Sequence, residues 1–158
     1  MRRIRFAALA MALVLVVLAL CACNSTPKVT TTCTLSIYGT DNDPIIMNYK
    51  VEMTHKEGEP PSVLDAAVYA LQTFEITFDL DENNEGEATN LLSVTTKEGV
   101  TYKAGNAGEG RYQYWDYTAD GAAPEAGTGG PAQHDLIDGQ TIVFTFSVYD
   151  LAEEEAAG

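Results

Sequence analysis

The sequence predicts an α+β fold, with one helix packed on a mixed or antiparallel sheet of about five strands. Apolar and polar residues alternate from residue 30 to residue 54, which is the period of a strand. One convincing helical pattern follows, and alternation returns between residues 91 and 149. Two strands, a helix and further strands in this order are typical of the α+β class. We therefore expect residues 30–150 to form a single domain.

The first two strands are predicted at Thr30–Tyr38 and Ile45–Thr54, joined by the turn Gly39–Pro44. In the second strand, every other residue is apolar: Ile45, Met47, Tyr49, Val51 and Met53. One face of this segment is therefore apolar and the other polar. Such a pattern is typical of an antiparallel hairpin that is covered on one side.

The helix is predicted at Val63–Thr73. Ser62 occupies the N-cap position, and Asp65 three residues later completes a capping box with an acid in place of glutamate. An apolar stripe on one side of this helix is expected to pack on the hairpin: Val63, Leu64, Ala67, Val68 and Leu71. The residues that follow, Phe74–Phe78, alternate like a strand, and the sequence leaves open whether they form one.

The remaining strands come after the helix. They are predicted at Leu91–Thr96, Val100–Ala104, Arg111–Thr118 and Gln140–Tyr149. Residues on one face of the last strand are expected to face the core: Ile142, Phe144, Phe146 and Val148. The pair Asp138-Gly139 predicts a turn directly before that strand.

Three segments are predicted to lack regular structure. Asp79–Asn90 is rich in acidic residues and predicts a solvated loop. Asp120–Pro131 is rich in glycine and proline, which predicts a flexible loop. Residues 151–158 are acidic and rich in alanine, and we expect a disordered tail.

The N-terminus has the organisation of an export signal. Three arginines lie within the first five residues, and an uncharged apolar run extends from Phe6 to Ala22. The sequence Leu20-Cys21-Ala22-Cys23 resembles the cleavage site of bacterial lipoprotein signals. Cys23 follows a small residue and Cys21 follows a bulky one, so we predict that residues 1–22 are removed and that Cys23 carries the lipid. An uncleaved membrane-spanning helix is the alternative.

A lipoprotein signal implies a location. The lipid chains on Cys23, typically palmitate-like acyl chains, would hold the protein on the extracytoplasmic face of the cell membrane. Residues 23–29 would then form a lipidated N-terminus and a short tether in front of the domain. This protein would need no membrane-binding surface of its own.

The predicted mature chain is strongly acidic. Removal of the three arginines leaves 6 basic residues against 23 acidic residues, a formal charge near −17. This charge argues against nucleic acid and anionic membrane surfaces as partners, and it suits cationic ligands. After processing, Cys33 is the single thiol without lipid, which excludes a disulfide within the chain. We expect it to be a small core residue, with a reactive thiol as the alternative.

Three segments resemble one bacterial family. They are Ser62–Ala67, with the run Ser-Val-Leu-Asp-Ala-Ala; Tyr114–Gly121, with a Tyr-Trp pair; and His134–Phe144, with an Asp-Gly turn before an aromatic strand. In this order and spacing they resemble the bacterial domain family of unknown function that is similar to the C-terminal β-domain of transcobalamin. Asp120 and Gln140 depart from the family pattern, and both retain turn chemistry.

This resemblance implies a β-grasp-like domain that binds a soluble ligand. In transcobalamin the related domain covers one face of cobalamin, and a helical domain supplies the rest of the pocket. The resemblance therefore implies cobalamin, or a related molecule, as a bound ligand and implies no catalytic cofactor.

The aromatic strand is the best candidate for a binding site. Alternation places Trp115 and Tyr117 on one face and Tyr112 and Tyr114 on the other. Aromatic residues beside a glycine-rich loop can stack on a flat ligand. The candidate ligand contacts are Tyr114, Trp115, Tyr117, Asp120 and Gly121. In the alternative interpretation, Trp115 anchors the core and the tyrosines simply suit strands.

The sequence indicates no enzyme and no metal site. Its two histidines, His55 and His134, lie in separate loops, and no nucleophile elbow, metal-ligand spacing or phosphate-binding loop is present. The segment from Asp79 to Glu87 has alternating oxygen ligands like a calcium loop. It has Asn84 where glycine is needed and Asn90 where a bidentate glutamate is needed, so we favour an acidic solvated loop.

We therefore expect a membrane-anchored extracytoplasmic lipoprotein that binds a small molecule. Its partners would be the membrane, through the lipid, and a ligand such as cobalamin, which it would hand to a transporter or another surface protein. In the alternative, the protein is an accessory of a surface complex or transporter and has no small-molecule ligand. Exposed strand edges would then bind the partner. A passive surface protein is the third hypothesis.

Overall fold

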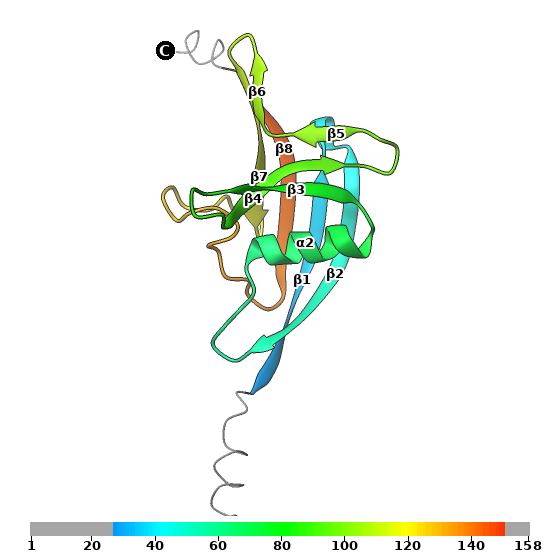
Figure 1. The fold of residues 1–158 in the computed structure, drawn as a ribbon. Helices are drawn as coiled ribbons and strands as arrows, with labels where there is room; N and C mark the ends of the chain where they lie inside the picture. Colours follow the sequence, from blue (N-terminus) through cyan, green and yellow to red (C-terminus); the bar gives the residue numbers. More distant parts are fainter. Residues whose placement is uncertain (1–26, 151–158) are drawn as a thin grey trace, which may run out of the picture.

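The computed structural model describes residues 27–150 (Figure 1). The predicted signal peptide, the lipid site Cys23 and the acidic tail lie outside these residues. The strands are β1 (Lys28–Tyr38), β2 (Pro44–Lys56), β3 (Thr77–Glu82), β4 (Ala88–Thr95), β5 (Thr101–Lys103), β6 (Gly105–Gly108), β7 (Arg111–Ala119) and β8 (Gln140–Asp150). The α-helix is α2 (Val63–Thr73), and a short 3-10 turn, η1 (Thr40–Asn42), joins β1 to β2. Within the described part of the chain, no helix has the length and apolar character needed to cross a membrane.

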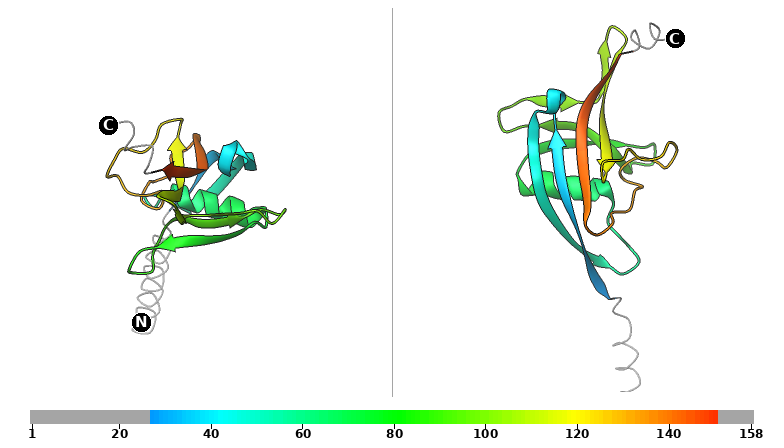
Figure 2. Two further views of the ribbon diagram at one scale, coloured as in Figure 1. Left: turned by 90° about the horizontal axis from the view of Figure 1, so that it is seen from above. Right: turned by 180° about the vertical axis from the view of Figure 1, so that it is seen from behind.

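The strands form two sheets. Five strands lie in the order β2-β1-β8-β7-β6, and three lie in the order β3-β4-β5. In the first sheet β1 and β8 are parallel and every other pair is antiparallel, so the sheet is mixed. Figure 2 shows α2 between the two sheets. The prediction of an α+β fold with one helix on a mixed five-stranded sheet is confirmed, whereas the second sheet was not predicted. The β-grasp assignment stays a prediction.

The second sheet corrects the prediction of an acidic loop at Asp79–Asn90. Strand β3 continues to Glu82 and β4 begins at Ala88, so only the residues between them form a turn. Phe78 and Leu80 are partly buried and alternate with exposed acidic residues. The acidic residues are therefore on the solvent-facing side of an antiparallel strand. The acidic composition of the whole segment does not reveal this alternation.

The helix has the predicted boundaries and cap. The Ser62 hydroxyl accepts a hydrogen bond from the Asp65 N–H at 3.1 Å, and the Asp65 carboxylate accepts one from the Ser62 N–H at 2.7 Å. Residues of the predicted stripe are buried, with Val68 partly so. They pack on the apolar face of the first sheet, where Leu35 and Val51 are fully buried. The prediction that the helix covers the hairpin is confirmed.

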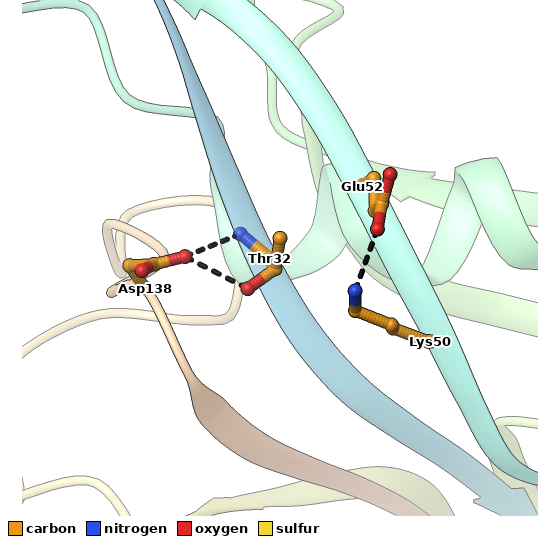
Figure 3. A network of polar contacts seen from close by, with 4 residues as sticks. All are labelled: Thr32, Lys50, Glu52 and Asp138. Carbon is orange, nitrogen blue, oxygen red and sulfur yellow. Dashed lines mark hydrogen bonds and ion pairs between the residues drawn. The ribbon is translucent and has the colours of Figure 1, made fainter.

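The parallel pairing of β1 with β8 is fixed at the Asp138-Gly139 turn. Asp138 Oδ1 accepts hydrogen bonds from the N–H and the hydroxyl of Thr32, both at 2.8 Å (Figure 3). The Gly139 N–H donates to the Thr32 carbonyl at 2.8 Å. The hydrogen bond from the Thr32 N–H is the main cause of the lowered pKa of Asp138. The hydrogen bond from the Thr32 hydroxyl and the positive charge of Lys50 lower this pKa further. Lys50 itself pairs with Glu52 at 2.6 Å.

Candidate ligand-binding groove

The aromatic strand β7 places two of its four aromatic rings in the core. Trp115 and Tyr117 are 3% and 4% exposed, whereas Tyr112 on the opposite face is 51% exposed. Trp115 packs against Phe146 and Tyr102, with ring centroids 5.1 Å and 6.4 Å apart. Tyr102 belongs to β5, so the unpredicted second sheet covers this face. Direct ligand contact by Trp115 and Tyr117 stays a prediction, and the structure shows both rings packed against other side chains.

Asp120 and Gly121 form a two-residue turn at the end of β7. Both have positive φ, +52° and +79°, and Ala119 and Ala122 exchange hydrogen bonds of 2.9 and 3.0 Å across the turn. Such a conformation is that of a type I′ turn, for which Asp-Gly is a preferred pair. The Asp120 carboxylate accepts a hydrogen bond from the Thr141 N–H at 2.8 Å. These two residues therefore direct the chain into the following loop, and the Asp120 carboxylate is engaged in that task.

The loop after this turn, residues 122–137, borders an open groove of about 540 Å³, here called the loop groove. It is lined by Pro124, Glu125, Thr128, Gln133, His134, Asp135 and Ile137. Ile137 is 61% exposed and forms its apolar wall. Of the predicted contacts, the structure brings Tyr117 next to this groove, while Tyr114 lies on the opposite face of β7.

The loop groove has a rigid base, although its sequence predicts a flexible loop. The His134 and Pro131 carbonyls accept hydrogen bonds from the Val63 and Leu64 N–H groups at 2.9 and 3.0 Å. These N–H groups belong to the first turn of α2 and have no partner within the helix. The loop is also close to β4, because a Cβ on Gly130 would lie 2.9 Å from the Thr89 carbonyl oxygen. The C-terminal part of the loop is therefore attached to the N-terminal end of α2.

His134 connects the core to the loop groove. Its Nδ1 lies 3.0 Å from the Tyr117 hydroxyl, and the two rings meet edge to face. Burial, followed by the charge of Asp116, raises the pKa of Tyr117. The raised pKa keeps the phenol protonated, and either the Tyr117 hydroxyl or Nδ1 can be the donor of this hydrogen bond, depending on the tautomer of the imidazole. No local sequence signal indicates this pairing, because the two residues are 17 positions apart in different elements.

Further titratable groups lie in the loop groove and in the core. Glu125 and Asp135 line the groove, and neither forms an ion pair within residues 27–150. Cys33 lies elsewhere, fully in the core, and burial raises the pKa of its thiol to about 11. This supports the interpretation of Cys33 as a core residue, because the thiolate is the reactive form. In the described part of the chain, no three His, Cys, Asp or Glu side chains converge as a metal site would require.

Comparisons with known proteins give no family. No family model matches the sequence, and no curated protein matches it. Among solved structures, haptocorrin in complex with Cbi is similar over 80% of this chain, with a TM-score of 0.49 and 17% identity. This chain spans 27% of the haptocorrin chain. A protein from Ruminococcus gnavus ATCC 29149 that is proposed to bind metal matches 74% of this chain and 96% of its own, with a TM-score of 0.37 and 14% identity.

Proposed function

We propose that this protein is a binding protein without catalytic activity, held on the extracytoplasmic face of the membrane by lipid on Cys23, and that it binds a small molecule in the loop groove. The observation that carries this proposal is the apolar wall of Ile137 next to a histidine that the core holds in one orientation. An exposed apolar wall with a few fixed polar groups is the usual composition of a small-molecule site. The acidic chain and the export signal agree with this role.

The groove is preorganised for binding. Its base is hydrogen-bonded to the first turn of α2, and Tyr117 fixes the His134 ring. A ligand therefore orders few groups when it binds, which lowers the entropic cost of association. Burial of the exposed part of Ile137 would contribute about 1.4 kcal/mol, which is a tenfold gain in affinity.

The polar groups indicate which ligand chemistry fits. Glu125 and Asp135 favour a ligand with hydrogen-bond donors or positive charge, and the imidazole of His134 offers a further polar contact. Cobalamin is the ligand implied by the resemblance of the sequence, and its amide side chains carry both donors and acceptors. We propose cobalamin or a related molecule as the first ligand to test, with transfer to a transporter as its use.

The test is a titration of the full chain in an uncharged detergent with cobalamin, followed by amide chemical shifts. We expect saturable shifts at Ile137, Thr128 and neighbouring residues. Ile137→Ser should weaken binding about tenfold. Met47→Ser is the matched control, since Met47 is 58% exposed on β2, outside the groove, and its loss should leave the affinity unchanged. An absence of shifts at millimolar cobalamin would exclude cobalamin as a ligand of this chain.

A protein partner is the second candidate function, and the position of β2 favours it. Strand β2 has 13 residues and forms an edge of the five-stranded sheet. A partner strand can pair with such an edge by backbone hydrogen bonds. Pull-down from solubilised membranes separates the two functions. A partner that Ile137→Ser retains and that a proline at Thr54 releases would favour strand addition, provided that the proline variant has an unchanged melting temperature.

A further inference from the structure

A second hollow lies at the other end of α2, away from the loop groove. It has a volume of about 410 Å³ and lies between the start of β2, the residues after α2 and the turn from β4 to β5. We call it the helix-end cleft. No role assigned so far to this chain uses it.

The walls of the helix-end cleft are apolar side chains that folding leaves partly in water. Phe74 and Val100 are 38% and 47% exposed, and Ile45 and the buried Ile76 complete the lining. The Phe74 ring is held in place by Tyr49, edge to face, with ring centroids 4.9 Å apart. A fixed aromatic ring beside apolar walls can accept the body of a small ligand.

The backbone at the end of α2 is strained in a way that shapes this cleft. Glu75 has a φ of +55°, in the left-handed region that favours glycine. The Ile76 N–H donates to the Leu71 carbonyl at 2.9 Å, which closes the helix in a Schellman-type turn. Phe74 and Ile76, on either side of Glu75, both line the cleft as a result. Strain of this kind is often found at binding sites.

The charges around the cleft select a cation. The C-terminal end of a helix carries a partial negative charge, and the carboxylates of Asp43 and Glu98 also line the cleft. Asp43 is fixed by the Tyr102 hydroxyl, which donates to it at 2.7 Å. The face of an aromatic ring adds attraction for a cation. Lys97 is the one opposing charge among the lining residues, and it lies on the exposed turn between β4 and β5.

We propose that the helix-end cleft binds a small organic cation with an apolar body, such as a quaternary or protonated amine. The apolar body would contact Phe74 and Val100, and the cationic head would lie towards Asp43 and Glu98. Lys97 would reduce the affinity for such a cation by charge repulsion. This inference does not depend on the function proposed for the loop groove.

Three probes of similar size and different charge test this proposal: benzyltrimethylammonium, benzyl alcohol and phenylacetate. Each is added to the isotope-labelled full chain in an uncharged detergent, and amide shifts are mapped. We expect saturable shifts at Phe74, Ile76 and Val100 with benzyltrimethylammonium and no such shifts with the other two probes. Equal shifts with benzyl alcohol or phenylacetate, or cation shifts spread evenly over all surface carboxylates, would overturn the proposal.

Variants give the second arm of the test. Phe74→Leu keeps the apolar volume and removes the ring, and it should weaken cation binding about two- to fivefold. Lys97→Gln should strengthen binding, and Glu98→Gln should weaken it, since both side chains are on an exposed turn and neither change endangers the fold. Ile137→Ser in the loop groove is the control and should have no effect. A cation affinity that Lys97→Gln and Glu98→Gln leave unchanged would also overturn the proposal.

Discussion

The two ends of α2 differ in how their backbone groups are satisfied. At the N-terminal end, Ser62 and Asp65 form a reciprocal cap, and the next N–H groups donate to the carbonyls of His134 and Pro131. At the C-terminal end, Glu75 adopts a positive φ and Phe74 stays partly exposed. The N-terminal end is therefore satisfied and supports the loop groove, whereas the C-terminal end is strained and opens into the helix-end cleft. A single helix can thus border one hollow at a capped end and another at an end with a strained backbone.

The largest expected effect is on stability, and it compares a buried residue with an exposed residue near the C-terminal end of α2. Leu71 is fully buried, so Leu71→Ala should lower the free energy of unfolding by about 2–5 kcal/mol. Tyr69 on the same helix is 41% exposed, and Tyr69→Ala should cost less than about 1 kcal/mol. Urea unfolding of both variants measures the difference. Equal losses would show that the helix does not pack on the first sheet as described.

The next effect tests the N-terminal end. Ser62→Ala removes the side-chain acceptor of the cap and should destabilise the protein by about 1 kcal/mol. Ser62→Thr keeps the hydroxyl at the N-cap position and is the control, which we expect to be close to the wild type in stability. Thermal unfolding compares the three proteins. The cap also positions the groove, so Ser62→Ala should broaden the amide resonances of residues 131–136, and unchanged resonances would separate the cap from the groove.

The strained C-terminal end predicts a gain in stability. Glu75→Gly removes a side chain that disfavours positive φ and should stabilise the folded protein by about 0.5–1 kcal/mol. Glu75→Ala is the matched control, because it removes the same carboxylate and keeps the Cβ, and it should not stabilise. Chemical unfolding measures both. A loss of stability with glycine would mean that the left-handed conformation is not the source of strain at this end.

The same contrast explains which features were predictable from the sequence. The cap, the helix and the hairpin depend on spacing within a few residues, so Ser62, Asp65 and the alternation of β2 were sufficient to predict them. The second sheet was not predicted, because the acidic residues of β3 indicated a loop although Phe78 and Leu80 alternate with them. The surroundings of the candidate site were least predictable, because burial of Trp115 depends on β5, and the link from Tyr117 to His134 depends on where a long loop returns. Contacts between distant segments carry no local sequence signal.

The pH dependence of stability gives the last and smallest expected effect, at a place away from both helix ends. Hydrogen bonds from Thr32 lower the pKa of Asp138 below that of an unfolded aspartate, about 3.9. Because the folded state favours the charged carboxylate, Asp138 stabilises the protein fully above the unfolded pKa, and this contribution disappears as the pH falls through the lower folded pKa. Asp138→Asn removes the charge and keeps an acceptor for Thr32. We expect its melting temperature to lie below that of the wild type at pH 7, and the difference to vanish as the pH falls from about 5 to below 3. A difference that stays constant over this range would show that packing at the turn, and not the charge of Asp138, fixes the pairing of β1 with β8.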